Sequence, residues 1–510
     1  MKINTKFITL LLPLTLLANA TFAGNDFSAI DRYVNAVKEE VGLPSGTAIA
    51  IVKDGEIVYE GYFGYANVKE KKKVTSNTAF YLASVTKPLF ALSTLLMENN
   101  GKIKDTTSMT EMFPDINFPH LDTSHIQVKH LLSHTHALAN RPLEDTLAFT
   151  GQHNKLQRYK LAAATTIDKA TELGNFQYSN LGYNLLSLWA EDSFKQDWQK
   201  TIAELVYQPL SMQHTSSYTS DAPKKGYEIA RPYGFYVEDP EEILPFEKSD
   251  ETMQAAGGTV SSARDMARFL IAQLNEGRVD DKQVFPASVI KKSHQQLAVN
   301  DLKYRDFIRK GYAWGWYMGP YKEEKMYHHF GGVAGTHAHT SFMIEHNIGL
   351  VVLNNESTVG SKMTNGIADI AYSILLNKGD ANTIADAHLK SMQNSWKAME
   401  IDIQETFDSH KKRNASRTMT LTQDKANYAG SFRNPLWGKL IVELLKTNEL
   451  KFSLGDLKAV ATAGKYPDEF RIQFQSSGRI AAYKVIDGEL SSIDVYGINP
   501  LGVERFTRIN

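Results

Sequence analysis

The sequence predicts an α/β protein of the α+β type, in which one antiparallel sheet is flanked by helices and a small all-β domain follows at the C-terminus. Three observations carry this prediction. β-Rich runs lie at both ends of the region 24–378, helical patterns fill its middle, and short alternating strands recur over 418–510. A single sheet that joins the two ends and is covered by helices is the simplest packing for such a pattern.

The first elements read as a helix, a hairpin and a second helix. Apolar residues at helical spacing predict an amphipathic helix over 26–41. Two β-rich runs then flank Asp54-Gly55, a strong hairpin signal, so residues 47–67 are expected to form two antiparallel strands. The next helical pattern begins close to Ser84 and stops at Gly101.

The later elements of the region follow the same reasoning. In chain order we expect mostly helical residues over 126–190, a long irregular excursion at 220–250, a turn and helix over 255–274, two strands over 337–354 and a helix at about 362–377. Four aromatic side chains of the irregular excursion are expected to wall a pocket: Tyr227, Tyr233, Phe235 and Tyr236.

Two further segments complete the predicted domain organisation. Residues 379–417 are polar and helix-prone, and are expected to form a helical connector and linker. From Tyr428 onward, turn signals such as Gly455-Asp456 and Asp487-Gly488 separate short alternating strands. We therefore expect a small all-β domain over 418–510, either a barrel or a sandwich, and we assign it as a barrel.

Composition excludes several classes of function. The chain of 510 residues contains 56 Lys and Arg against 57 Asp and Glu, a net charge of −1, so no basic excess points to nucleic acid. Cysteine is absent, which rules out disulfides, a cysteine nucleophile, thiolate metal sites and a lipoprotein anchor.

The first 23 residues have the pattern of a secretory signal peptide. Lys2 and Lys6 precede an apolar run from Phe7 to Leu17, and small residues follow up to Ala23. About 11 apolar residues are too few to cross a bilayer core, which needs about 20. We expect cleavage after Ala23, a periplasmic or secreted product, and no membrane span once this segment is removed.

The first candidate for chemistry is the Ser84-Val85-Thr86-Lys87 segment. Residues three apart at the start of a helix share a face, so the Lys87 amine can lie beside the Ser84 hydroxyl and take its proton. The free N–H of Ser84 can bind an oxyanion. The same spacing recurs at Ser288-Lys291 and Ser409-Lys412, neither of which is expected to open a helix after a strand.

The second candidate is Tyr178-Ser179-Asn180. A tyrosine within reach of the serine can act as a general base if nearby cations lower its pKa. Asn180 can hold a substrate amide or orient Lys87.

The third candidate is His329-Phe330-Gly331, placed just before the penultimate strand of the sheet. Small residues at Gly331 and Gly332 allow close approach of the backbone to a ligand, and the Gly332 N–H can serve as a second oxyanion donor. His329 can bind a substrate carboxylate or carry a proton.

Taken together, the three motifs in this order resemble the serine β-lactamase-related family of class C β-lactamases, D-peptidases and related esterases. Their order is S-x-x-K, Y-x-N and then K-T-G or H-x-G, with similar intervals. The flanking text VKDGEIVYEGYFGYANV, IQVKHLLSHTHAL and AAGGTVSSARDMARF is also similar, and the resemblance covers about residues 27–375. It implies a β-lactamase/transpeptidase-like sheet with an all-helical subdomain, whereas residues 418–510 resemble the barrel appendages of some members more loosely.

The resemblance also implies roles for the residues. Ser84 attacks a carbonyl and forms an acyl-enzyme that water hydrolyses, Lys87 and Tyr178 share the proton transfers with Tyr178 favoured as the base, and Asn180 positions the substrate. The N–H groups of Ser84 and Gly332 form the oxyanion hole. No metal or organic cofactor is implied.

Two departures from the family pattern shape the functional expectation. His329 stands where true β-lactamases of this type carry lysine, and a neutral histidine attracts a β-lactam carboxylate less than an ammonium does. The loop reads His134-Thr135-His136-Ala137 where the family often has H-T-S-G. We therefore expect an esterase or D-peptidase acting on a small ester or peptide, with β-lactam hydrolysis as the alternative; no oligomeric state follows from these motifs.

The sequence also leaves two alternative functions open. Histidines at H-x-H or paired spacing could bind zinc in a metal hydrolase: His134, His136, His328, His329, His337 and His339. A non-catalytic protein that binds cell wall or peptide on a hydrolase scaffold is the second rival, although all three motifs are intact.

Overall fold

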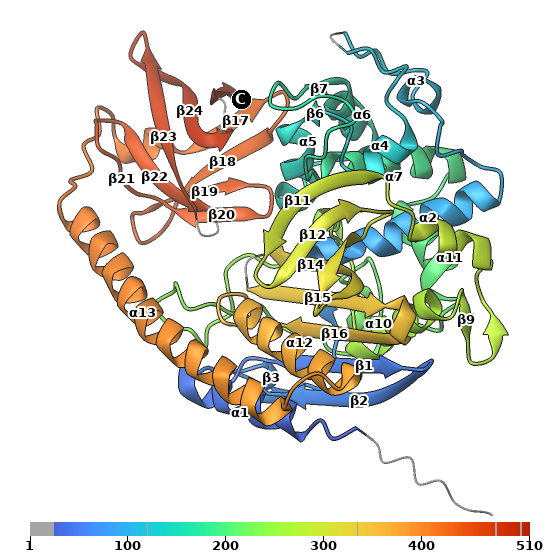
Figure 1. The fold of residues 1–510 in the computed structure, drawn as a ribbon. Coiled ribbons are helices and arrows are strands. Elements are labelled where there is room, and N and C mark those ends of the chain that lie inside the picture. The colour runs from blue at the N-terminus through green and yellow to red at the C-terminus, as the bar shows by residue number, and fades with distance from the viewer. Residues whose placement is uncertain (1–24, 120, 334, 475–476, 500–501, 510) are drawn as a thin grey trace, which may run out of the picture.

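An antiparallel sheet of eight strands forms the centre of the protein (Figure 1). The computed structural model describes residues 25–119, 121–333, 335–474, 477–499 and 502–509. In spatial order the strands are β11 (Ala298–Tyr304), β12 (Phe307–Tyr312), β13 (Tyr317–Tyr321), β14 (Glu324–Val333), β15 (Thr336–Met343), β16 (Ile348–Asn354), β1 (Thr47–Lys53) and β2 (Glu56–Phe63). Strands β1 and β16 pair from Thr47 opposite Asn354 to Lys53 opposite Ile348, so one sheet joins the two ends of the region, as predicted.

Helices cover both faces of this sheet because strands inside it, such as β1, are apolar on both sides. On β1, Ala48, Ala50 and Val52 belong to one buried core, and the alternate residues Ile49 and Ile51 belong to the other. The first core is completed by α2 (Thr86–Asn99) and α10 (Ala263–Leu274). The second is completed by α1 (Ser28–Val41), α12 (Gly360–Leu376) and α13 (Ala381–Ala415), which Figure 1 shows together on the lower face.

The chain between α2 and α10 alternates helices with loops, in agreement with the pattern of helices with loops that was predicted for 126–190. Its helices are α3 (Met109–Met112), α4 (Val128–Leu132), α5 (Arg141–Asp145), α6 (Lys155–Ala163), α7 (Leu181–Phe194), α8 (Trp198–Ile202) and α9 (Asp221–Lys225), and α11 (Ala287–Ser293) follows α10. Irregular chain occupies most of 226–249. Short paired strands connect the elements: β3 (Tyr65–Asn67) with β4 (Lys72–Lys73), β5 (Phe80–Tyr81) with β8 (Val260–Ser261), β6 (Leu138–Ala139) with β7 (Thr166–Ile167), and β9 (Arg278–Val279) with β10 (Lys282–Gln283).

Half of the central sheet was not expected from the sequence. Strands β11 to β13 lie at its edge, and β11 (AVNDLKY) is largely exposed, so its apolar and polar residues do not alternate in the way that marks a half-buried strand. His329 lies inside β14, a strand that the sequence did not predict and that pairs with β13 and β15. Strand β14 directly precedes β15, the strand that His329 was expected to precede.

The C-terminal part is a nine-stranded antiparallel sheet that curls into a nearly closed barrel, in agreement with the predicted fold class (Figure 1). Its interior is filled by aromatic and aliphatic side chains, among them Phe432, Trp437 and Phe470. The strands are β17 (Gly430–Asn434), β18 (Gly438–Leu444), β19 (Leu450–Leu454), β20 (Leu457–Val460), β21 (Thr462–Ala463), β22 (Glu469–Phe474), β23 (Ser477–Ile486), β24 (Glu489–Asn499) and β25 (Gly502–Ile509).

The barrel docks on the rest of the protein through two of its turns. The Gln152 side chain accepts from the backbone N–H of Lys439 at 2.8 Å and donates to the Lys439 carbonyl at 2.9 Å. In the β19–β20 turn, Asp456 accepts from the Ser249 hydroxyl at 2.6 Å, and its N–H donates to the Thr150 carbonyl at 3.0 Å. The barrel therefore rests on the segments around residues 150 and 250.

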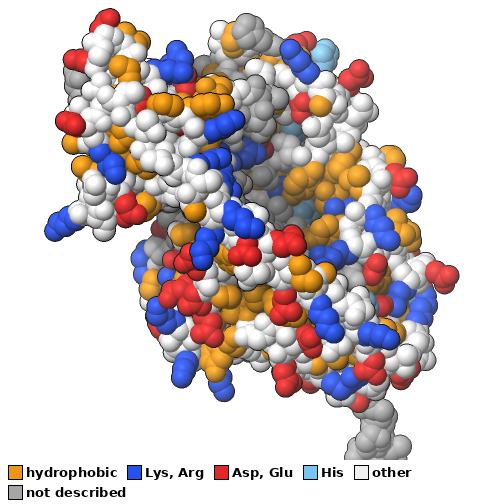
Figure 2. Space-filling view, turned by 90° about the vertical axis from the view of Figure 1, so that its left-hand side faces the viewer, with side chains coloured by type: hydrophobic (Ala, Val, Ile, Leu, Met, Phe, Trp, Pro, Cys, Tyr) orange, Lys and Arg blue, Asp and Glu red, His pale blue; other side chains and the backbone are white. Residues whose placement is uncertain are grey.

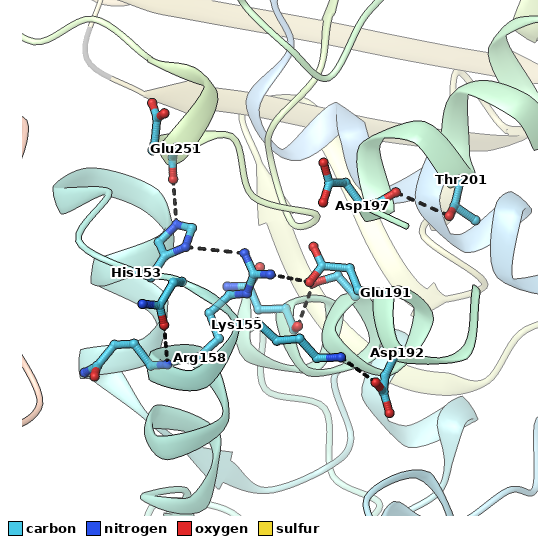
Figure 3. A network of polar contacts seen from close by, with 12 residues as sticks. His153, Lys155, Arg158, Glu191, Asp192, Asp197, Thr201 and Glu251 are labelled. Atoms are coloured by element: carbon cyan, nitrogen blue, oxygen red, sulfur yellow. Dashed lines mark hydrogen bonds and ion pairs between the residues drawn. The ribbon is translucent and has the colours of Figure 1, made fainter. Parts of the chain in front are cut away.

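A polar network joins the segments around residues 150 and 250, on which the barrel rests, to the helical region (Figure 3). His153 contacts the Glu251 carbonyl at 2.7 Å, Arg158 pairs with Glu191, and Lys155 pairs with Asp192 at 2.6 Å. These contacts join α6 to α7 and to the chain that precedes α10.

Both signs of charge are mixed over the surface, in keeping with the net charge of −1. The space-filling view shows a deep hollow in the upper half of one face, with Lys and Arg side chains along one rim and hydrophobic side chains along the opposite rim (Figure 2). Within the described part of the chain, no helix is both long enough and apolar enough to cross a membrane.

Candidate active site

Ser84 lies on a short 3₁₀ turn, Ala83–Val85, that leads from β5 directly into α2. The residue before it, Ala83, has a φ of +46°, a left-handed conformation that a residue with a Cβ rarely adopts. Ser84 is partly exposed, whereas its neighbours on both sides are buried. The fold thus presents a single hydroxyl at the start of a buried helix.

Lys87 lies one helical turn further and is fully buried. Its Nζ is 3.1 Å from the Ser84 Oγ, 2.8 Å from the Asn180 Oδ1 and 2.8 Å from the Ala256 carbonyl oxygen. Desolvation lowers the pKa of Lys87 to about 7, and the charge of Glu144 acts in the opposite direction. The structure therefore brings an amine that can lose its proton near neutral pH into contact with the serine.

The loop that carries Tyr178 and Asn180 is held by His134, which the sequence offered only as a possible zinc ligand, and by Glu144, which the sequence did not single out. The His134 carbonyl accepts from Gln177 N at 2.8 Å and its Nδ1 accepts from Ser179 N at 3.2 Å, with the ring 4.4 Å from that of Tyr178. Glu144 accepts from the backbone N–H of Asn180 at 3.0 Å. Asn180 stands at the N-cap of α7, yet its side chain makes no cap bond and instead accepts from Lys87.

Tyr178 and Asn180 line a cavity of about 340 Å³, and 38% of the Tyr178 surface is exposed. The Lys87 amine lies 4.7 Å from the centroid of its ring. Desolvation holds the pKa of Tyr178 well above its ordinary value, the neighbouring Tyr317 adds to this, and a hydrogen bond with the Ser84 side chain acts in the opposite direction. Tyr178 thus contacts the serine as a phenol that keeps its proton at neutral pH.

Gly331 and Gly332 differ in how tightly they pack. A Cβ on Gly331 would lie 2.0 Å from the Leu82 carbonyl oxygen and 2.9 Å from the Ser84 nitrogen, so only glycine lets β14 approach the serine turn this closely. A Cβ on Gly332 would meet nothing nearer than the Thr336 oxygen at 3.8 Å. Gly332 itself is exposed.

His329 is buried, and both of its ring nitrogens contact other atoms of the protein. Its Nδ1 is 2.7 Å from the Phe330 carbonyl oxygen, which can only accept, so this nitrogen carries the proton. Its Nε2 is 3.3 Å from the Tyr312 hydroxyl. Desolvation and the charge of Lys87 keep the pKa of His329 well below its ordinary value. A neutral ring with both nitrogens engaged is poorly suited to bind a substrate carboxylate.

A cavity of about 600 Å³ adjoins the end of β14. Val333, Tyr81 and Thr336 line it, together with residues of the 219–232 and 246–251 segments. Of the four aromatic side chains expected to wall a pocket, Tyr227 lines this cavity. The other three are engaged elsewhere: Tyr233 accepts from Val68 N, Phe235 packs on Trp396, and Tyr236 donates to Asp402.

The remaining sequence patterns do not form comparable sites. Ser288 does begin a helix, α11, after β10, contrary to the expectation, but the Lys291 amine is exposed and pairs with Glu276 at 2.9 Å. Ser409 lies inside α13. Among the residues that the structure describes, no three His, Cys, Asp or Glu side chains gather closely enough to hold a metal ion.

The sheet with its helical middle, and the lysine beside a serine at a helix start, define the β-lactamase/transpeptidase class of folds. A family model described as Beta-lactamase matches residues 30–371. The chain belongs to this family.

Two curated relatives are similar over most of the same region. Penicillin-binding protein 4* of Bacillus subtilis is 24% identical over 338 residues, which are 61% of this chain and 68% of that protein. Protein flp of Staphylococcus aureus (strain N315) is 24% identical over 327 residues, 64% of this chain and 62% of that protein. The chain thus spans somewhat under two thirds of protein flp.

Two solved structures share the fold. An octameric penicillin-binding protein homologue from Pyrococcus abyssi has a TM-score of 0.58 at 20% identity, and the match covers 94% of this chain and 100% of that one. The D-amino acid amidase from Ochrobactrum anthropi SV3 has a TM-score of 0.54 at 18% identity over 68% of this chain and 99% of that one.

Proposed function

We propose that the protein is an exported serine hydrolase that cleaves small esters or peptide and amide bonds through an acyl-enzyme on Ser84. The observation that carries the proposal is the 3.1 Å contact between the Ser84 hydroxyl and the buried Lys87 amine, whose other two partners are the acceptors Asn180 Oδ1 and Ala256 O. A serine needs such a neighbouring base to become a nucleophile.

Lys87 is the proposed base. A neutral amine that donates its two N–H groups to Asn180 and Ala256 has its lone pair left for the Ser84 proton. The lowered pKa of about 7 makes this neutral form available near neutral pH. Tyr178 was favoured as the base from the sequence, but its raised pKa favours the opposite role, a phenol that relays a proton.

The proposed reaction has two steps, acylation of Ser84 and hydrolysis of the acyl-enzyme. The Ser84 oxygen bonds to the substrate carbonyl carbon while its proton passes to Lys87, and the N–H groups of Ser84 and Gly332 bind the oxyanion. The bond to the leaving group then breaks, and the leaving group takes a proton through Tyr178. Water repeats these steps on the acyl-enzyme, which releases the acid and restores Ser84.

The substrate class is a small ester or an amide of the D-peptidase type, with β-lactams as the alternative. The relatives named penicillin-binding protein and D-amino acid amidase support amide chemistry. A neutral His329 in place of a lysine argues for slow β-lactam turnover. The cavity of about 600 Å³ beyond Gly332 is large enough for a small acyl group.

A substrate panel tests the proposal. Purified protein is incubated with p-nitrophenyl esters, D-alanyl peptides and nitrocefin, beside Ser84→Ala. We expect turnover of esters or D-peptides that Ser84→Ala loses, with nitrocefin hydrolysed slowly or not at all. No turnover of any member, with no labelling by a penicillin-type probe, would support a non-catalytic binding protein instead. Activity that a chelator abolishes and Ser84→Ala retains would support a metal hydrolase.

Export is proposed from the sequence pattern of residues 1–23, which lie outside the described residues. The expected mature N-terminus is Gly24, in the periplasm or the medium. N-terminal sequencing of the protein from each cell fraction checks this, and a cytoplasmic protein that still begins at Met1 would contradict it.

A further inference from the structure

A cavity of about 240 Å³ lies where the turn between β11 and β12 meets α1, α12 and α13. Buried side chains of these three helices belong to one core of the protein, whereas those of α2, the helix that Ser84 leads into, belong to the other core. Helices α12 and α13 pack side by side on this face of the sheet (Figure 1). The cavity is therefore separate from the candidate active site.

Arg305 and Lys362 bring two positive charges to this cavity, and neither charge is paired. The Arg305 guanidinium donates to the Ser361 hydroxyl at 2.6 Å, and no described carboxylate pairs with either cation. Asp306 also lines the cavity, but its carboxylate accepts from the Asn365 side chain at 2.7 Å. Desolvation and the charge of Arg305 lower the pKa of Lys362, as expected for two neighbouring cations without an anion between them.

Three hydroxyl groups without partners line the same cavity. Tyr33 has only 1% of its surface exposed, yet its hydroxyl makes no hydrogen bond to any residue that the structure describes. A buried tyrosine hydroxyl usually has a partner, because leaving it without one costs free energy. Ser391 and Ser395, four residues apart on α13, also have side chains free of hydrogen bonds within the described ranges. His388, the remaining ionisable group of the wall, is bound to Asp369 at 2.7 Å.

We infer that this cavity binds a small anion that carries a phosphate group, with Arg305 and Lys362 as the cations that hold it. A phosphate group has a charge of about −1.5 to −2 near pH 7, which balances two cations better than the single charge of a carboxylate does. Its oxygens point in tetrahedral directions, so they can accept from donors on several walls of the cavity. The volume of about 240 Å³ lies below the range of cavities that hold drug-sized ligands. Inorganic phosphate and a small phosphomonoester are the two sources that fit.

The first test compares anions on the full chain. The dissociation constants of inorganic phosphate, methyl phosphate and acetate are measured by calorimetry at pH 7.5 and constant ionic strength. We expect saturable binding of at least one of the two phosphates, and binding of acetate at least tenfold more weakly. The tighter of the two phosphates identifies the source of the group, and either result supports the inference. No saturable binding of either phosphate, or acetate bound as tightly, would overturn it.

Substitutions of the two cations assign the binding to this cavity. We expect Arg305→Gln and Lys362→Gln each to weaken phosphate binding at least tenfold, because hydrogen bonds to charged groups have effects of that size. Tyr33→Phe, which removes one hydroxyl, is expected to weaken it at least threefold. Lys390→Gln is the matched control, because Lys390 is an exposed lysine beside Ser391 that does not line the cavity. Unchanged binding in both cation variants, or an equal loss in the control, would overturn the inference.

A second measurement locates the anion without any substitution, and it separates this cavity from the candidate active site. Wild type is acetylated with an N-hydroxysuccinimide ester, with and without saturating phosphate at equal ionic strength, and each lysine is quantified by peptide mass spectrometry. We expect phosphate to slow the labelling of Lys362 at least fivefold and to leave Lys390 unchanged. Equal labelling of Lys362 in both conditions, or protection of Lys87 alone, would overturn the inference. The result does not depend on the proposed hydrolase activity.

Discussion

Glu144 accepts a hydrogen bond from the backbone N–H of Asn180 at 3.0 Å, and Asn180 in turn accepts from Lys87 at 2.8 Å. A partly buried carboxylate is thus linked to the candidate base through one asparagine. The link has two consequences. It holds the Asn180 backbone where the side chain can accept from Lys87, and it places a negative charge where it raises the pKa of the amine.

The pH dependence of wild-type activity follows from Lys87. A base must be neutral to accept a proton, and the pKa of Lys87 is lowered to about 7. We expect kcat/KM to be level above this pH and to fall about tenfold per pH unit below it. A profile measured with a neutral ester checks this; an acid limb centred below pH 5 would contradict a lysine base.

We predict that Glu144→Gln shifts the acid limb of the kcat/KM profile, which is its fall at low pH. The amide oxygen of glutamine can still accept from Asn180, but the negative charge that raises the pKa of Lys87 is gone. We therefore expect the limb to shift to lower pH with the fold preserved, measured by the same profile together with circular dichroism. Asp192→Asn, which removes an exposed carboxylate paired with Lys155, is the control and leaves the limb in place. An upward shift in Glu144→Gln would be inconsistent with this electrostatic link.

Alanine substitutions at two adjacent glycines test whether the close packing of β14 against the serine turn is needed for activity. In Gly331→Ala the new methyl group would lie 2.0 Å from the Leu82 oxygen, so β14 must move away from Ser84. We expect a loss of about 10²-fold or more in kcat/KM, because displacements of about 1 Å have effects of that size. In Gly332→Ala the nearest atom is at 3.8 Å, and activity should change little. Equal behaviour of the two variants would refute the packing argument.

Docking of the barrel depends on Gln152. Gln152→Ala removes both hydrogen bonds to Lys439. We expect the barrel to be held less firmly by about 1–3 kcal/mol, the sum of two such bonds, and the linker around residues 416–424 to be cut faster in limited proteolysis. Gln157→Ala, which loses one longer bond of 3.3 Å to Pro435, is the milder control. Unchanged proteolysis of Gln152→Ala would show that other contacts hold the barrel.

The sequence best predicts the contacts and elements that are formed by residues close together in the chain. Lys87 follows Ser84 by three residues at a helix start, so spacing alone indicated that the two side chains meet. The β1–β2 hairpin at Asp54-Gly55 and the apolar helices were predicted for the same reason. The fold of the family then followed from the order of three motifs.

What the sequence did not reveal depends on tertiary contacts. Strand β11 forms an edge of the sheet, where exposure removes the alternation of apolar residues. Glu144 belongs to no motif, and its role arises only because the fold places it beside Asn180. The preference for Tyr178 as the base could not include the desolvation that raises its pKa.

The central claim is that Ser84 carries the acyl group, and covalent labelling tests it most directly. Wild type and Ser84→Ala are incubated with a fluorophosphonate, digested, and analysed by peptide mass spectrometry. The account predicts one adduct, on Ser84, in wild type and none in Ser84→Ala. An adduct on another residue, or equal labelling of both proteins, would contradict it.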